Sequence, residues 1–304
     1  MKPALLLYPH ISSYSVFLLL GFFGGWLVAR SRAQRYGILR RDLDNIVLIL
    51  PIAGLFGARF FARLFYAKLP VLEALKVWEG DGLVFYGGFI FGVAATLIYG
   101  AFRHMNLVSL SDCLAPSVAL GLAFGRVGCF LAGCCWGDVC IDRSQLAIVN
   151  DPAVVQRIQT IPPISQSSWP VAVQFPQRSD IYKQHARYHL VSTTETKSLP
   201  VHPVQLYEAL LAAGLCAYLA LRSLRRGPGD IALLLLAGYA VIRFGTEFLR
   251  ADNKLYAFGM TFSQVVSVYI LLGSVAIAGL RAFVRMQTLA SEPKVPQPAP
   301  IAVD

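Results

Sequence analysis

The chain has 304 residues, of which 56% are hydrophobic and only 14% are charged, whereas soluble domains carry about 25% charged residues. This composition excludes an ordinary soluble domain and indicates an integral membrane protein. The formal net charge of +10 is expected to serve membrane orientation and binding of anionic lipid head groups. The sequence contains no recognisable RNA- or DNA-binding motif, so no nucleic-acid partner is predicted.

Seven apolar stretches are long enough, or nearly so, to cross about 30 Å of hydrocarbon as helices. They lie at 12–29, 45–66, 83–102, 110–133, 203–221, 230–249 and 261–281. The expected fold class is therefore all-α integral membrane, a seven-transmembrane-helix bundle. The first apolar run has no small-residue cleavage site after it, so it is predicted to be a retained helix and not a cleaved signal.

A polar segment separates the fourth span from the fifth. It is rich in Pro, Ser, Gln and Thr and too long for a simple loop, so a small extracytoplasmic head with short helices or strands is expected. The predicted domains are transmembrane helices 1–4 at 1–135, the head at 136–201, transmembrane helices 5–7 at 202–285 and a disordered cytoplasmic tail at 286–304. The tail is assigned from its Pro-rich composition.

Basic residues predict the orientation of the spans. With seven crossings, the following arginines fall on one side of the membrane: Arg30, Arg32, Arg35, Arg40, Arg41, Arg103, Arg222, Arg225, Arg226, Arg281 and Arg285. That side is predicted to be cytoplasmic. The N-terminus, the head and the loop around Asp252 are then expected outside, although Lys2 alone argues the other way.

Charged residues inside apolar stretches are functional candidates, because each costs roughly 2.5–3.5 kcal/mol at bilayer depth. Tyr239, Arg243, Glu247 and Arg250 follow spacings of 4, 4 and 3, which place them on one helical face. Arg126 lies in a Gly-Arg-Val-Gly run near the outer end of the fourth span. A guanidinium is a planar fork that matches a phosphate group, which makes Arg126 and Arg243 candidate phosphate ligands. The alternative is that these charges pair with one another or extend to the interface.

Glycines support close approach within the predicted bundle. Gly121 and Gly125 form a small-xxx-small pair, which close helix packing readily explains. Gly87 and Gly88 follow Tyr86 at the start of the third span, where glycine weakens a helix. The pair beside Tyr86 therefore favours a functional interpretation over packing alone.

Four of the six cysteines form a C-x4-C-C-x4-C pattern. Cys129, Cys134, Cys135 and Cys140 match no standard zinc spacing, so no metal site is predicted. Three interpretations remain open: buried hydrophobic residues, a redox or thiol-exchange role, and a disulfide that links Cys140 to Cys134 or Cys135 in an oxidising compartment.

Three segments stand out as motifs. They are the run WEGDGLVFYGG at 78–88, the run GRVGCF at 125–130 with Trp136 and Gly137 after it, and HPVQLYE at 202–208 followed by Tyr239 and RFGTEFLR at 243–250. Together they resemble the prolipoprotein diacylglyceryl transferase family, and the resemblance runs from about Tyr14 to Leu280.

The resemblance implies an enzyme of the bacterial inner (plasma) membrane. It implies transfer of the diacylglyceryl group of phosphatidylglycerol to the lipobox cysteine thiol of a prelipoprotein, with a thioether formed and glycerol phosphate released. The implied partners are phosphatidylglycerol, prelipoprotein signal peptides and membrane lipids. The resemblance implies neither a metal nor an organic cofactor.

The predicted catalytic residues are Arg126, Arg243, Tyr86, His202 and Glu208. The two arginines would stabilise negative charge on the leaving phosphate, and the general base is left open among the other three. Tyr86 suits hydrogen bonding better than proton abstraction, and His202 titrates in the right range but precedes a proline that fits a helix start. The predicted phosphatidylglycerol-binding residues are Tyr14, Arg126, Gly128, Gln205, Tyr239, Arg243 and Glu247.

The chain departs from the family pattern at two cysteines. The family usually has Asn at the position of Cys129 and commonly an acidic residue at that of Cys134. These differences motivate two alternatives: a diverged paralogue that transfers a lipid or head group to another acceptor, and a non-catalytic lipid-binding membrane protein. No inverted repeat is visible between the two halves, which disfavours a transporter.

Overall fold

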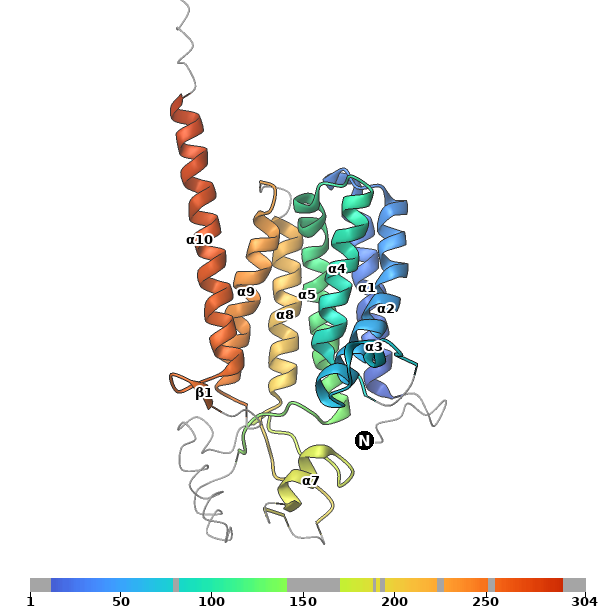
Figure 1. Ribbon diagram of the computed structural model, residues 1–304. Coiled ribbons are helices and arrows are strands. Elements are labelled where there is room, and N and C mark those ends of the chain that lie inside the picture. The colour runs from blue at the N-terminus through green and yellow to red at the C-terminus, as the bar shows by residue number, and fades with distance from the viewer. Residues whose placement is uncertain are drawn as a thin grey trace, which may run out of the picture.

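The computed structural model describes residues 12–78, 82–140, 170–187, 190–191, 195–222, 227–250 and 255–291. Long helices run side by side in a bundle, and α10 stands at one edge beside α9 (Figure 1). The long helices of the described chain are α1 (Ser13–Arg32), α2 (Arg40–Phe61), α4 (Phe85–Phe102), α5 (Leu107–Ala132), α8 (Val204–Arg222), α9 (Asp230–Glu247) and α10 (Phe262–Ser291).

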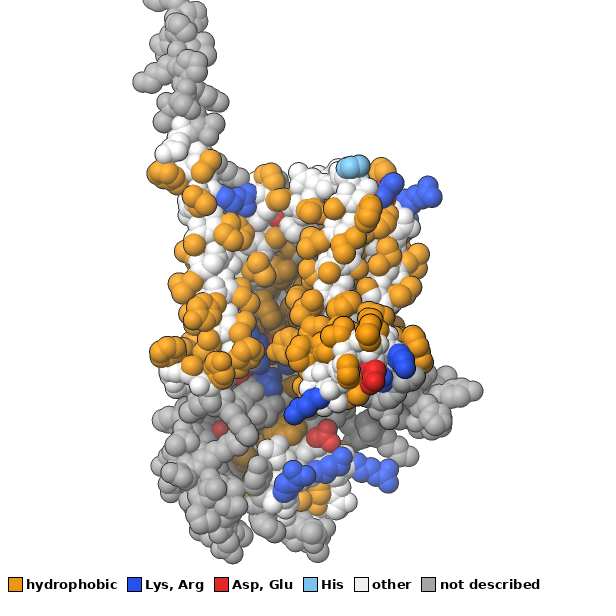
Figure 2. Space-filling view, viewed as in Figure 1, with side chains coloured by type: hydrophobic (Ala, Val, Ile, Leu, Met, Phe, Trp, Pro, Cys, Tyr) orange, Lys and Arg blue, Asp and Glu red, His pale blue; other side chains and the backbone are white. Residues whose placement is uncertain are grey.

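Five helical segments are long and apolar enough to cross a membrane: α1 with η1 (Ala33–Tyr36), α2 with the π-helical turn η2 (Ala62–Tyr66), α5, α8 and α10. The helix α4 is apolar but shorter, and α9 carries Asp230, Arg243 and Glu247 within its 18 residues. Hydrophobic side chains cover the flank of the bundle (Figure 2), which suits lipid tails and not water. The predicted all-α integral membrane class is confirmed.

Glycines allow the helices of the first half to approach closely. A Cβ added at Gly21 of α1 would lie 2.7 Å from Cβ of Phe124 on α5. Gly57 of α2 and Gly87 of α4 face each other, and a Cβ on either would overlap the carbonyl oxygen of the other. Packing of α4 on α2 therefore accounts for Gly87 without any functional role.

A buried carboxylate fixes α9 against α5. Asp112 of α5 is 1% exposed, and it accepts hydrogen bonds from the backbone N–H groups of Gly229 and Ala232 at the start of α9. A negative charge at a helix N-terminus satisfies free N–H groups and complements the helix dipole. This contact sets the position of α9, and hence of Arg243, relative to α5 and Arg126.

A small head lies at one end of the bundle, where α5 ends and α8 begins (Figure 1). It contains α7 (Asp180–Arg187) and isolated antiparallel bridges such as Val139–Val201 and Pro176–Lys197. A hydrophobic cluster holds it together: Trp136, Val139, Phe175, Ile181 and Val201. The segments 141–169, 188–189 and 192–194 of the predicted head lie outside the described residues.

Two short elements connect the longer helices. The helix α3 (Val71–Ala74) follows η2 on the way to α4. The hairpin of β1 (Leu255–Ala257) and β2 (Met260–Thr261) leads from α9 into α10.

The helix α10 runs to Ser291, beyond residue 286, where the tail was predicted to begin. All of residues 286–290 except Thr288 are good helix formers, and the first helix-breaking residue beyond them is Pro293. The remainder of the predicted tail, 292–304, lies outside the described residues, as do Arg225, Arg226 and Asp252.

Candidate active site

One carboxylate lies between the two arginines that the sequence singled out. Oε1 of Glu208, on α8, is 2.9 Å from Nη2 of Arg126 on α5, and Oε2 is 3.8 Å from Nη1 of Arg243 on α9. The Glu208 side chain is 1% exposed, whereas those of Arg126 and Arg243 are 17% and 15% exposed. Both guanidiniums therefore converge on one point, and each keeps part of its surface open to a ligand.

Tyr239 completes this arrangement from one turn before Arg243 on α9. Its hydroxyl donates a hydrogen bond to Oε1 of Glu208 over 2.9 Å, and a side-chain hydrogen bond also joins it to Arg126. A phenol within reach of the same carboxylate oxygen and the same guanidinium restricts the orientation of both.

Glu247 holds Arg243 from the other side, as the i,i+4 spacing predicted. Its Oε2 is 2.7 Å from Nη2 of Arg243, and its Oε1 accepts a hydrogen bond from Thr261 over 2.7 Å. Nη2 of Arg243 also donates to Oγ of Ser263 at the start of α10, over 3.0 Å. Groups from α8, α9 and α10 thus contact the Arg243 guanidinium, and the hairpin before α10 holds Glu247 in place.

Open space lies beside Arg126. A Cβ built on Gly125, the residue before it, would meet no described atom within 4 Å. The molecular surface is recessed between α10 and the helices around α4, with Lys or Arg side chains at the head-proximal end of the recess (Figure 2). Small residues next to a guanidinium permit the close approach of an anionic ligand.

Gln205 lies one turn before Glu208 on α8 and is fully buried. Its Nε2 donates to the backbone oxygen of Cys134 over 2.7 Å, whereas its Oε1 has no hydrogen-bond partner in the part of the chain that the structure describes. An unsatisfied buried acceptor costs about 1–3 kcal/mol, so this oxygen is available to a donor on a ligand.

His202 stands where the head meets α8. It is 1% exposed, and its backbone exchanges hydrogen bonds with Gly137 and Asp138. Burial lowers its pKa, because the charged imidazolium is poorly solvated there. The imidazole is therefore neutral at physiological pH and packed against Gly137, where an added Cβ would lie 2.6 Å from Cβ of His202.

Tyr14 packs against Gly128, whereas Tyr86 lies on α4 with most of its side chain exposed. A Cβ on Gly128 of α5 would be 3.1 Å from Cδ2 of Tyr14 on α1, so the tyrosine ring covers this glycine. Tyr86 is 62% exposed near the start of α4, whose main packing partner is α2. The hydrogen bonds and ion pairs around Glu208 described above come from α5, α8, α9 and the start of α10.

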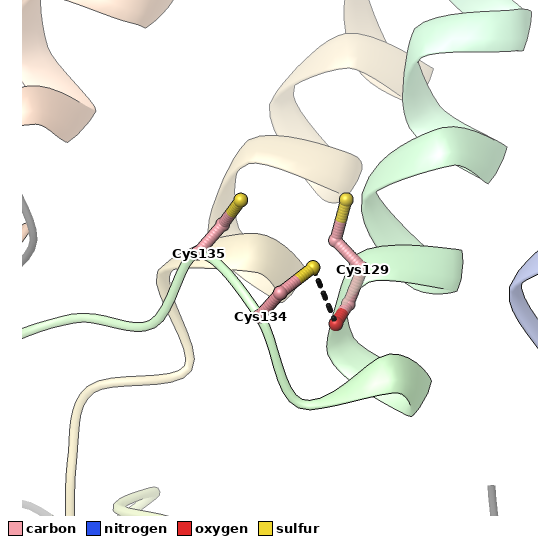
Figure 3. Close-up of side chains that lie close together, drawn as sticks. All are labelled: Cys129, Cys134 and Cys135. Carbon is pink, nitrogen blue, oxygen red and sulfur yellow. Dashed lines mark hydrogen bonds between the residues drawn. The ribbon is translucent and has the colours of Figure 1, made fainter. Parts of the chain in front are cut away.

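All six cysteines are free thiols, so the disulfide considered for Cys140 is not formed. The Cys140 thiol is buried and directed at the backbone oxygen of Asp138, 3.8 Å away. The Cys134 thiol instead points to the backbone oxygen of Cys129 over 3.6 Å (Figure 3). The sulfur atoms of Cys129, Cys134 and Cys135 all lie within 4.8 Å of one another, a grouping that the linear spacing did not predict.

Three residues that support the site were absent from the sequence prediction: Asp112, Thr261 and Ser263. Asp112 could have been found from the sequence, since an acidic residue inside an apolar stretch requires a partner. The sequence gives no reason to single out Thr261 or Ser263, because hydroxyl side chains are common where a helix begins.

Comparisons with known proteins show the family to which the chain belongs. Residues 3–280 match the family described as prolipoprotein diacylglyceryl transferase. The phosphatidylglycerol–prolipoprotein diacylglyceryl transferase of Burkholderia cenocepacia (strain HI2424) is 30% identical over 280 residues, which span 87% of this chain and 88% of the relative. A protein of the same name from Burkholderia multivorans is 29% identical, over 91% of this chain and 92% of its own length. The one from Paraburkholderia phymatum is also 29% identical, over 87% of this chain and 87% of its own length. The chain is a member of the prolipoprotein diacylglyceryl transferase family.

Proposed function

We propose that this membrane enzyme transfers the diacylglyceryl group of phosphatidylglycerol to the lipobox cysteine of a prelipoprotein. The family membership and the names of the relatives support this donor and this acceptor. The observation that carries the proposal for the site is the convergence of Arg126 and Arg243 on the single carboxylate of Glu208. A place that holds one anionic group between two guanidiniums suits a phosphodiester.

In the proposed reaction, the substrate thiol attacks the glyceryl carbon that carries the phosphate. The carbon–sulfur bond forms, the carbon–oxygen bond to phosphate breaks, and glycerol phosphate leaves with the bonding electrons. Negative charge grows on the departing phosphate, and Arg126 and Arg243 stabilise it in a site with little water. Glu247 and Ser263 keep Arg243 in the required orientation.

Glu208 is the proposed proton acceptor. Its carboxylate is the counter-ion that Arg126 and Arg243 share before substrate binds, and the arriving phosphodiester takes over that role. The carboxylate then accepts the thiol proton, which passes to the leaving phosphate, so that protons and charge balance. The other two candidates suit this step less well, because His202 is packed against Gly137 and Tyr86 is largely exposed on α4.

The remaining predicted ligands are assigned to the phosphatidylglycerol head group and its surroundings. The buried Oε1 of Gln205 accepts a hydrogen bond from a glycerol hydroxyl. Tyr239 orients Glu208, and Tyr14 over Gly128 forms the apolar wall on the α1 side. These groups lie on α1, α5, α8 and α9, around the two arginines.

We propose seven transmembrane helices in a bacterial inner membrane: α1, α2, α4 and α5 in residues 1–135, and α8, α9 and α10 after residue 202. The N-terminus and the 136–201 head are extracytoplasmic, and the C-terminus is cytoplasmic. The arginine excess on the loops opposite the head supports this orientation. The site then lies near the outer leaflet, because Arg126 and Arg243 are near the head-proximal ends of their helices.

Mass spectrometry of a lipobox peptide tests the reaction. The purified protein is incubated with the peptide and phosphatidylglycerol, and a diacylglyceryl mass shift on the peptide cysteine is expected. A different adduct would identify a paralogue with another transfer reaction. Lipid that co-purifies without any peptide adduct would identify a lipid-binding protein and overturn the proposed catalysis.

A further inference from the structure

A cluster of three thiols lies next to the arginine site and has no role in the proposed transfer. Cys129 comes from the last turn of α5, and Cys134 and Cys135 follow directly after that helix. The chain reverses there through two left-handed residues, Gly133 with φ 71° and Cys135 with φ 60°. A non-glycine residue in this conformation is uncommon, and here it turns the third sulfur toward the other two (Figure 3).

The three sulfur atoms have the spacing of a metal-binding set. Each pair lies within 4.8 Å. A metal bound to three sulfurs at about 2.3 Å separates them by about 4 Å when it sits in their plane. Closure of the thiols onto one ion therefore needs only a small inward movement of side chains.

We propose that Cys129, Cys134 and Cys135 form a three-thiolate site for a soft monovalent metal ion of the copper(I) class. Thiolates favour soft ions such as copper(I) and zinc. Structural zinc takes four ligands, and no fourth Cys, His, Asp or Glu of the described residues joins this group. A trigonal set of sulfurs therefore suits copper(I) better than zinc.

Two arginines act on the cluster. The positive charges of Arg126 and Arg250 reach Cys135, and cations nearby stabilise thiolate ligands. Arg250 is held close by, because its backbone pairs with Gly137 in an antiparallel bridge. Copper(I) would displace the thiol protons without any change of oxidation state.

The metal site is joined to the proposed catalytic site by one hydrogen bond. Gln205 donates to the backbone oxygen of Cys134 and lies one turn before Glu208. An ion held by Cys134 would therefore fix the turn that positions Gln205. The proposed metal site therefore lies beside the substrate site, but the bound ion takes no part in the chemistry of transfer.

Anaerobic copper(I) titration of the reduced, detergent-solubilised full chain tests the proposal, with bicinchoninate as the competing chelator. One copper(I) ion per chain is expected. Cys129→Ser, Cys134→Ser and Cys135→Ser should each weaken binding at least about 100-fold, since each removes a direct ligand. The matched control Cys216→Ser changes a cysteine buried in α8, in another part of the core, and should bind copper(I) like the unchanged chain.

X-ray absorption of the copper-loaded unchanged chain provides a second measurement that does not depend on how the variants fold. Three sulfur neighbours are expected. Coordination by two sulfurs, or by nitrogen and oxygen, would overturn the site, as would equal copper affinity in the Cys135→Ser variant. A disulfide between two of the three cysteines, in a chain that retains no copper after reduction, would assign the cluster to redox chemistry instead. None of these outcomes depends on diacylglyceryl transfer.

Discussion

Glu208 is the residue on which the geometry of the site depends, because it is the shared partner of two arginines. Glu208→Gln removes the charge but keeps the shape, and it leaves both guanidiniums without their common counter-ion. Breaking a buried ion pair in this way costs about 3–5 kcal/mol. Thermal unfolding in detergent should therefore show a clearly lower midpoint for this variant, together with loss of transfer.

Asp44→Asn is the matched control for that change. Asp44 pairs with Arg30 over 2.7 Å, but the two side chains are 32% and 37% exposed. Pairs of that kind contribute about 0–1 kcal/mol, so this variant should unfold close to the unchanged protein. If the two substitutions lowered the midpoint of thermal unfolding equally, Glu208 would not be the buried counter-ion that the two arginines share.

His185 makes the head sensitive to acid. Burial in α7 lowers its pKa from 6.5 to about 4, and its Nδ1 accepts a hydrogen bond from the backbone of Leu199. The unfolded head binds a proton more readily than the folded head, so stability is full above pH 6.5 and falls as the pH drops toward 4. The loss should reach about 2 kcal/mol near pH ~5.

Hydrogen exchange of residues 180–187, corrected for intrinsic rates, measures this effect. Protection should fall between about pH 7 and pH 5 in the unchanged chain. His185→Gln retains an acceptor but does not titrate, so its protection should not change over that interval. A pH response that survives this substitution would assign the effect to another group.

Much of the site could be predicted at the residue scale. The cost of a charge inside an apolar helix identified Arg126 and Arg243 as functional candidates. The helical spacing then placed Glu247 beside Arg243. The central position of Glu208 could not be predicted, since it depends on how α8 is rotated against α5 and α9. The thiol cluster was missed for a similar reason: its geometry comes from a left-handed turn at Cys135.

At the scale of elements, the contact between α2 and α4 depends on glycine. Gly57→Ala would place a Cβ against the carbonyl oxygen of Gly87 and 2.5 Å from Cβ of Phe91. Such overpacking costs about 1–3 kcal/mol. Gly273→Ala in α10 is the control, because its Cβ would meet nothing within 4 Å and alanine favours a helix. The midpoint of thermal unfolding should be lower for Gly57→Ala than for Gly273→Ala. Equal midpoints would contradict the proposed contact between α2 and α4.

The apolar runs predicted helix positions well and helix ends less well. The span expected at 83–102 is α4 (Phe85–Phe102), and α5 begins after Asn106, whose side chain caps Val108 and Ser109. In contrast, α2 begins at Arg40, before the apolar run expected at 45–66, because polar residues can continue a helix beyond the bilayer. The head was unpredictable, since isolated bridges leave no periodic pattern.

At the scale of the whole molecule, the proposed orientation places the end of α10 in the cytoplasm. A fluorescent protein fused after Ser291 should fluoresce in growing cells, whereas alkaline phosphatase at the same position should be inactive. A fusion inserted near residue 187 of the head should show the opposite behaviour, because the head is proposed to face outward. Active phosphatase at the C-terminus would require a different number of crossings.

The central claim is that Arg126 and Arg243 act together on one lipid phosphate. The most direct measurement is the rate of diacylglyceryl-peptide formation by Arg126→Lys and Arg243→Lys. Arg103→Lys is the control, because Arg103 is half exposed and pairs with Asp42, away from the site. Each site variant should lose about 10²–10³-fold in kcat, since lysine keeps the charge but not the fork, while the control keeps its rate. Near-normal turnover by either site variant would contradict the claim.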